Sequence, residues 1–144
     1  MKSDLEKAKE LLENEDLTCA VIFGEHEYKS RENGVKPLLF AINQGKDFAC
    51  ASAADRVCGR AAAFLYAKLG VKRLYSGTLS KPAAAVLEKY GIEYSYTELV
   101  DYIKNRDGSG MCPMENAVLE INDADKALVA IKDTVSKLMA NKGI

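Results

Sequence analysis

Two β-rich segments on either side of an alanine-rich helix constrain the fold of this chain more than any other feature. Residues 71–76 and 92–96 are rich in residues typical of strands. Between them, Pro82 to Tyr90 predicts a helix that ends at Gly91. A strand-helix-strand order implies a right-handed crossover and two parallel strands. The sequence therefore predicts an α/β fold.

The N-terminal part predicts further strands in the same sheet. Asp4 to Asn14 has the apolar spacing of an amphipathic helix. Leu17 to Phe23 is nearly all apolar, and Gly24-Glu25 permits a tight turn into a second strand, His26 to Ser30. Pro37 opens a short helix. We expect a mixed sheet with an N-terminal hairpin and parallel β-α-β units.

The segment from Ser52 to Leu69 predicts the central helix, because it is rich in alanine and is followed by Gly70. Ser52 is the expected N-cap, and Asp55 three residues on makes a variant of the capping box. Arg56 and Arg60 are then spaced i, i+4 and lie on one face of this helix.

The C-terminal part predicts helices only. Thr97 is expected to cap a short helix that reaches Lys104, and Pro113 to Ile121 predicts another. The last helix is expected at about residues 123–140. The sequence shows no linker or repeat, so residues 1–144 predict a single domain.

Composition excludes several classes of protein. The chain is 48% hydrophobic and 28% charged with a net charge of −1, so no bulk attraction to nucleic acid or to a membrane is expected. No apolar run approaches the ~20 residues of a membrane helix, and the N-terminus lacks a signal-peptide core, so a cytoplasmic location is expected. The cysteines form no Cys-x-x-Cys pair, which favours free thiols over a disulfide framework or a structural zinc site.

Cys112 is the strongest candidate for chemistry. Pro113 suits the first position of a helix, so Cys112 is expected at its start, where the helix dipole lowers the pKa of a thiol. The thiol is either a nucleophile or redox-sensitive group, or a small packed residue. A nucleophile usually needs a base, and the one histidine, His26, is expected near the hairpin turn.

Two carboxylates and a glycine have two interpretations each. Glu115, expected at the third position of its helix, either complements the helix dipole or acts as a general base or ligand anchor beside Cys112. Asp55 is either part of the cap or a site residue. Gly59, one turn further on, admits either a ligand or the close approach of another element.

An anion site is a further hypothesis. Arg56 and Arg60 are either solvated and paired with carboxylates, or receive a phosphate or carboxylate group. The expected ligand-binding residues are Ser52, Arg56, Gly59, Arg60, Asn105, Arg106, Gly108 and Gly110.

Two segments carry a resemblance to a known family. Residues 53–62 (AADRVCGRAA) and 105–115 (NRDGSGMCPME) resemble an uncharacterised prokaryotic family, a domain of unknown function with a cytidine-deaminase-like fold. The resemblance covers roughly residues 3–121. It implies a three-layer α/β/α fold and self-association into a homo-oligomer, but no established activity.

The chain departs from working deaminases at the zinc site. Those enzymes carry His-x-Glu or Cys-x-Glu at the start of the central helix and Pro-Cys-x-x-Cys at the next. In this chain, the resemblance matches these two segments to Ala53-Ala54-Asp55 and to residues 77–81. Neither segment contains a histidine or cysteine that could bind zinc. The resemblance places Asp55 where the proton-transfer carboxylate stands. We expect no metal, no cofactor and no zinc-dependent deamination.

These observations predict a protein that binds a small anionic or nucleotide-like ligand near Cys112 and Asp55, with Glu115 at the same pocket. Two alternatives stay open. One is a metal-free enzyme that uses Cys112 as nucleophile or redox thiol, with Asp55 and Glu115 as its other catalytic residues. The other is a protein-interaction module with a vestigial pocket.

Overall fold

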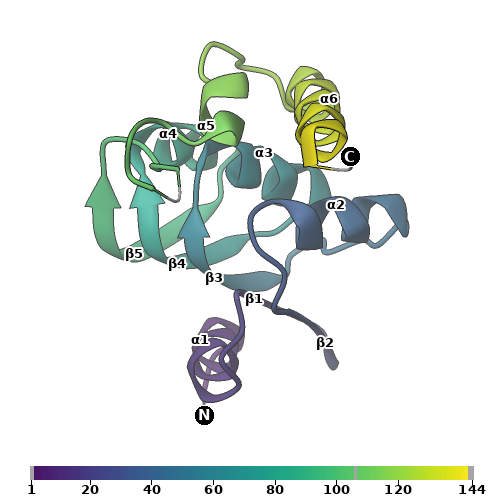
Figure 1. Ribbon diagram of the computed structural model, residues 1–144. Helices are drawn as coiled ribbons and strands as arrows, with labels where there is room; N and C mark the ends of the chain where they lie inside the picture. Colours follow the sequence, from purple (N-terminus) through teal and green to yellow (C-terminus); the bar gives the residue numbers. More distant parts are fainter. Residues whose placement is uncertain (1, 106, 143–144) are drawn as a thin grey trace.

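The structure, a computed structural model, describes residues 2–105 and 107–142 and has three layers (Figure 1). Its elements are α1 (Asp4–Asn14), β1 (Cys19–Phe23), β2 (His26–Ser30), α2 (Lys36–Asn43), β3 (Ser52–Cys58), α3 (Arg60–Leu69), β4 (Arg73–Ser80), α4 (Lys81–Lys89), β5 (Glu93–Val100), α5 (Pro113–Ala117) and α6 (Ala124–Lys142). The expected α/β/α class, with an N-terminal hairpin and parallel β-α-β units, is confirmed.

The five strands form one sheet in the order β2-β1-β3-β4-β5. Strand β1 is antiparallel to both β2 and β3, whereas β3, β4 and β5 are mutually parallel. The carboxyl ends of these three strands therefore lie at one edge of the sheet, where open α/β sheets usually bind ligands. The register places Asp55 between Cys19 on β1 and Ser76 on β4.

Helices cover the two faces of the sheet unequally. Among the helices that the structure describes, α1 alone covers one face (Figure 1), where Leu12 is buried in a cluster that includes Ala54 of β3. The other face carries the larger core, built around α3 with Phe64 and Leu65 fully buried. Ile131 of α6 belongs to the same core, and α6 packs on α3.

The predicted central helix is wrong over its first seven residues, because Ser52–Cys58 forms strand β3. Ser52 is paired with Ile22 and Arg73 and is buried, so it is no N-cap and Asp55 completes no capping box. Ala53 and Ala54 are fully buried. With α1 on one face of β3 and α3 on the other, small side chains suit the middle of the sheet, and this packing overrides the helix propensity of alanine.

This correction separates the two arginines. Arg56 belongs to β3 and Arg60 begins α3, with Gly59 between them as an extended N-cap residue, so they do not share a helix face. The helix expected from Thr97 to Lys104 is also wrong. Thr97 lies in β5, and beyond Val100 the chain is an irregular loop.

Helix α5 is shorter than expected and ends at Ala117. Beyond it, the carbonyl groups of Val118 and Ile121 accept hydrogen bonds from the Arg60 guanidinium. Within the described ranges, no helix combines the length and the hydrophobicity needed to cross a membrane.

Candidate functional site

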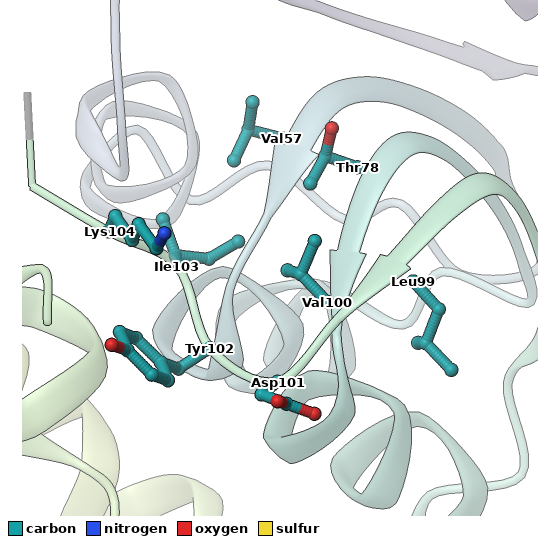
Figure 2. Close-up of a pocket in the computed structure, with 8 residues that line it drawn as sticks. All are labelled: Val57, Thr78, Leu99, Val100, Asp101, Tyr102, Ile103 and Lys104. Carbon is teal, nitrogen blue, oxygen red and sulfur yellow. The ribbon is translucent and has the colours of Figure 1, made fainter. Parts of the chain in front are cut away.

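Three hollows meet around Val57, near the carboxyl end of β3. The strand-end hollow, about 670 Å³, lies where β3, β4 and β5 end, and the chain leaving β5 turns past it through Asp101 to Lys104 (Figure 2). The Cys112 pocket is about 320 Å³ and the Asp55 hollow about 180 Å³. Val57 lines all three, and it is 49% exposed. It is therefore the point at which the three spaces adjoin.

The Cys112 pocket has mostly apolar walls. Val57, Ile103 and Met114 line it, together with Ala61 and Ala62 from the first turn of α3. Its remaining lining residues are Asn33, Gly34, Val35, Gly59, Cys112 and Glu115. No lysine or arginine is among these lining residues. The pocket therefore suits an uncharged, apolar group.

Cys112 stands at the N-cap of α5, as expected, with Pro113 at the first helical position. Its backbone N–H donates to the carbonyl of Ile103 at 2.8 Å, and its side chain makes no capping hydrogen bond. The thiol is half-buried and lines the pocket. It is thus placed to touch a ligand there.

Glu115 is buried and ties three segments together. Its Oε1 accepts the backbone N–H of Arg60 at 2.5 Å, and its Oε2 accepts the backbone N–H of Ile103 at 2.7 Å. One carboxylate from α5 therefore caps α3 and also holds the loop after β5. Because both oxygens accept N–H groups, the contacts support an anchoring role over a general base for Cys112.

Gly59 allows this arrangement. A Cβ atom at this residue would lie 3.1 Å from Oε1 of Glu115 and 3.1 Å from Cγ1 of Ile103. Of the two interpretations of Gly59, the close approach of another element therefore describes its surroundings.

Arg60 is buried, and its guanidinium group binds backbone carbonyl groups. It donates to Val118 at 2.9 Å, to Pro82 at 2.9 Å and to Ile121 at 2.5 Å. A further bond at 3.0 Å goes to Oδ1 of Asn122. Burial is the main cause that lowers the pKa of this group. The side chain thus joins α3, α4 and the segment after α5.

Arg56 points to different partners. Its Nε donates to the carbonyl of Leu17 at 2.5 Å and its Nη2 to that of Leu12 at 2.9 Å, with Asp16 3.3 Å away. Arg56 and Arg60 therefore both hold the chain together through backbone carbonyl groups.

Asp55 lies in a buried cluster with Tyr66 and Cys19. Its Oδ2 accepts the hydroxyl of Tyr66 at 2.6 Å, and its Oδ1 accepts the backbone N–H of Val57 at 3.2 Å. The Tyr66 oxygen is also 3.2 Å from Sγ of Cys19. Burial raises the pKa of Asp55 to about 7, against the lowering effect of these hydrogen bonds. Burial likewise raises the pKa values of Tyr66 and Cys19.

Asn105 forms hydrogen bonds to two glycines that follow it, Gly108 and Gly110. The Asn105 carbonyl accepts the N–H of Gly108 at 3.0 Å, and its side-chain oxygen accepts the N–H of Gly110 at 3.4 Å. Asn105, Gly108, Gly110 and the strand residue Ser52 line none of the three hollows. Arg106, the remaining residue of the expected anion site, lies outside the described residues.

The structure therefore brings together only part of the expected site. Cys112, Glu115 and Gly59 line the Cys112 pocket, whereas Asp55 lines the adjoining hollow on the other side of Val57. Sequence reasoning missed Val57 and Tyr66. The alternation of a strand over residues 53–57 would have placed Asp55 and Val57 on one face, but the segment was predicted to be helical.

The residues at the two helix starts do not fit the zinc site of a deaminase. Helix α3 starts after Cys58 and Gly59, so Asp55 lies in a strand and does not stand at the helix start, where the resemblance placed it. One buried thiol, that of Cys58, precedes α3. The start of α4, with Ser80 as N-cap followed by Lys81 and Pro82, supplies no sulfur or imidazole ligand. Across residues 2–105 and 107–142, no group of three or more His, Cys, Asp or Glu side chains is placed to hold a metal ion.

The fold and the hollows define a small α/β/α domain with an apolar pocket at the carboxyl edge of its parallel strands. The chain belongs to the family described as TM1506: Domain of unknown function (DUF1893), whose model matches residues 7–135. The resemblance seen in the sequence is thereby confirmed.

Solved structures include a similar protein. A crystal structure of a DUF1893 family protein (TM1506) from Thermotoga maritima is 28% identical, with a TM-score of 0.82 over 95% of this chain and 92% of that one. A diaminohydroxyphosphoribosylaminopyrimidine deaminase/5-amino-6-(5-phosphoribosylamino)uracil reductase from Thermotoga maritima matches at 18% identity and a TM-score of 0.38, over 55% of this chain and 29% of that one. That likeness is too slight to support an argument. No curated protein matches the chain.

Proposed function

We propose that this protein binds a small nucleotide-like ligand, with an apolar ring held in the Cys112 pocket. The observation that carries the proposal is the pocket itself, about 320 Å³ with apolar walls beside a helix start. This volume lies within the range of roughly 300–1,000 Å³ that is typical of small-molecule sites. The position at the carboxyl edge of parallel strands agrees with the usual place of ligand sites in such sheets.

Polar recognition is expected from the first turn of α3. The first N–H groups of a helix have no acceptor within it. Glu115 accepts the N–H of Arg60, while Ala61 and Ala62 line the pocket. Their N–H groups are suited to a polar ring edge or to an anionic group. Because neither Arg56 nor Arg60 lines this pocket, the geometry favours a ring-bearing ligand over a simple anion.

The contacts support binding more than turnover. Cys112 would need a base to act as a nucleophile. Glu115, the expected base, accepts two backbone N–H groups, and Asp55 lines the next hollow. Cys112 is therefore assigned to the pocket wall.

A thermal-shift panel of nucleotides and phosphosugars tests the proposal. A ligand at 100 times its Kd stabilises the folded state by about 2.7 kcal/mol, which raises Tm by several degrees. Cys50 is exposed while Cys19 and Cys58 are buried, so iodoacetamide should modify only Cys112 in a Cys50→Ser protein. We expect this modification to abolish the shift.

The matched control is the double variant Cys50→Ser, Cys112→Ser treated with the same reagent, which should keep the shift. The proposal fails if no member of the panel raises Tm, or if carboxamidomethylated Cys112 leaves the shift unchanged.

A further inference from the structure

The Asp55 hollow continues the Cys112 pocket. The two spaces share Asn33, Gly34 and Val57 in their walls. At about 180 Å³ the hollow has room for a small polar substituent. A ligand with its ring in the Cys112 pocket is therefore able to extend one group past Val57 toward Asp55.

The polar residues that line the hollow are Thr18, Glu32, Asn33, Asp55 and Arg56. Asp55 supplies a buried carboxyl group, and Glu32 supplies a second, exposed one. Arg56 also lines the hollow, but its guanidinium group donates to the carbonyl groups of Leu12 and Leu17. The hollow thus holds two carboxyl groups and a guanidinium group that is bonded elsewhere.

The other titratable groups packed against Asp55 are a tyrosine and two thiols. Tyr66 of α3 donates to it, while Cys19 of β1 and Cys58 of β3 are buried thiols nearby. None of these groups is a cation. Burial raises the pKa of Asp55 to about 7, so near neutral pH the carboxyl group is divided between its two forms.

We infer that the Asp55 hollow receives a cationic nitrogen group, an amine or amidinium, carried by the ligand whose ring occupies the Cys112 pocket. This inference rests on the proposed function. The N–H donors of such a group form charge-assisted hydrogen bonds to a carboxylate, and an amidinium group presents two of them side by side. The cation binds the ionised form of Asp55, so binding releases a proton from the protonated form.

Benzamidine and benzamide form a matched pair of probes. Both carry an apolar ring and a planar substituent of similar size, but only the amidinium group of benzamidine is charged. We expect calorimetry to show tighter binding of benzamidine. Its affinity should rise about tenfold from pH 6 to pH 8 as Asp55 ionises, with the sign set by a pKa of about 7. Benzamide should show no such change.

Asp55→Asn keeps the shape of the side chain and removes its charge. This variant should lose at least tenfold in benzamidine affinity and lose the pH dependence, while benzamide binding stays. Glu25→Gln, which removes an exposed carboxylate at the hairpin turn outside the hollow, is the matched control and should change benzamidine affinity by less than twofold. If Asp55→Asn does not fold, the pH profiles of the two probes with the unmodified chain decide the question.

The outcomes separate the two proposals. Equal, pH-independent binding of both probes, abolished by carboxamidomethylation of Cys112, overturns the cationic group and leaves the pocket in place. Loss of benzamidine binding with Glu25→Gln instead of Asp55→Asn also overturns it. Binding of neither probe to the Cys112 pocket overturns both the inference and the ring site on which it rests.

Discussion

At residue 55, burial and hydrogen bonding have opposite effects on the pKa of a carboxyl group. Burial disfavours the charged form of Asp55, while the donors on Tyr66 and on the Val57 backbone favour it. Burial prevails, and the pKa rises from the ordinary 3.8 to about 7. A strand position between α1 and α3 produces this balance, because both faces of β3 are covered.

The raised pKa predicts a pH-dependent stability. Between about pH 4 and pH 7 the folded chain holds the Asp55 proton and the unfolded chain releases it, so the stability that Asp55 contributes is full below pH 4 and is lost as the pH rises through 7. From pH 5 to pH 8, the free energy of unfolding should fall by roughly 2–3 kcal/mol more in the unmodified protein than in Asp55→Asn. Urea denaturation at the two pH values measures this, and parallel losses in both proteins would contradict it.

At the scale of elements, one side chain of the short helix α5 organises the pocket. Glu115 caps α3 through the N–H of Arg60 and holds the loop after β5 through the N–H of Ile103. Gly59 leaves the space in which that carboxylate lies. The pocket wall therefore depends on contacts between residues that are 55 and 12 positions apart in sequence.

Gly59→Ala should disturb this junction. The added methyl would lie 3.1 Å from both Glu115 and Ile103, and crowding of this kind costs about 1–3 kcal/mol of unfolding free energy. Gly110→Ala is the matched control, since its methyl meets no atom within 4 Å and its φ lies outside the left-handed region, so its effect should stay within about 0.5 kcal/mol. Equal stabilities of the two variants in chemical denaturation would refute the crowding argument.

For the whole molecule, the outer helix α6 completes the larger core. Ile131 of α6 is fully buried, whereas Val129 on the same helix is 70% exposed. Arg60 also links α3 to the segment between α5 and α6, because its guanidinium group donates hydrogen bonds to carbonyl groups of that segment. Self-association, which the family resemblance implied, stays a prediction for sedimentation experiments.

Ile131→Ala should cost about 2–5 kcal/mol, since it removes buried methyl groups and leaves a cavity beneath α6. Val129→Ala, on the exposed side of the same helix, should stay within about 0.5 kcal/mol. Thermal and urea unfolding of the two variants compares them directly. A small effect of Ile131→Ala would show that α6 does not pack on α3 in solution.

The sequence by itself predicted the elements whose signals are local. The amphipathic spacing of α1, the β-rich run of β1 and the Gly91 that follows α4 each depend on neighbouring residues, and each prediction is confirmed in outline. Pro113 likewise placed Cys112 at a helix start. The α/β class followed from the order of these elements, and the family resemblance implied the three layers.

Only the tertiary structure decided the state of residues 52–58 and the partners of the site residues. Alanine favours a helix in isolation, but burial between α1 and α3 makes this segment a strand. The contacts of Asp55 with Tyr66 and of Glu115 with Ile103 join different elements. Local sequence does not predict such pairings, because they form only when the sheet register and the helix packing bring distant residues together.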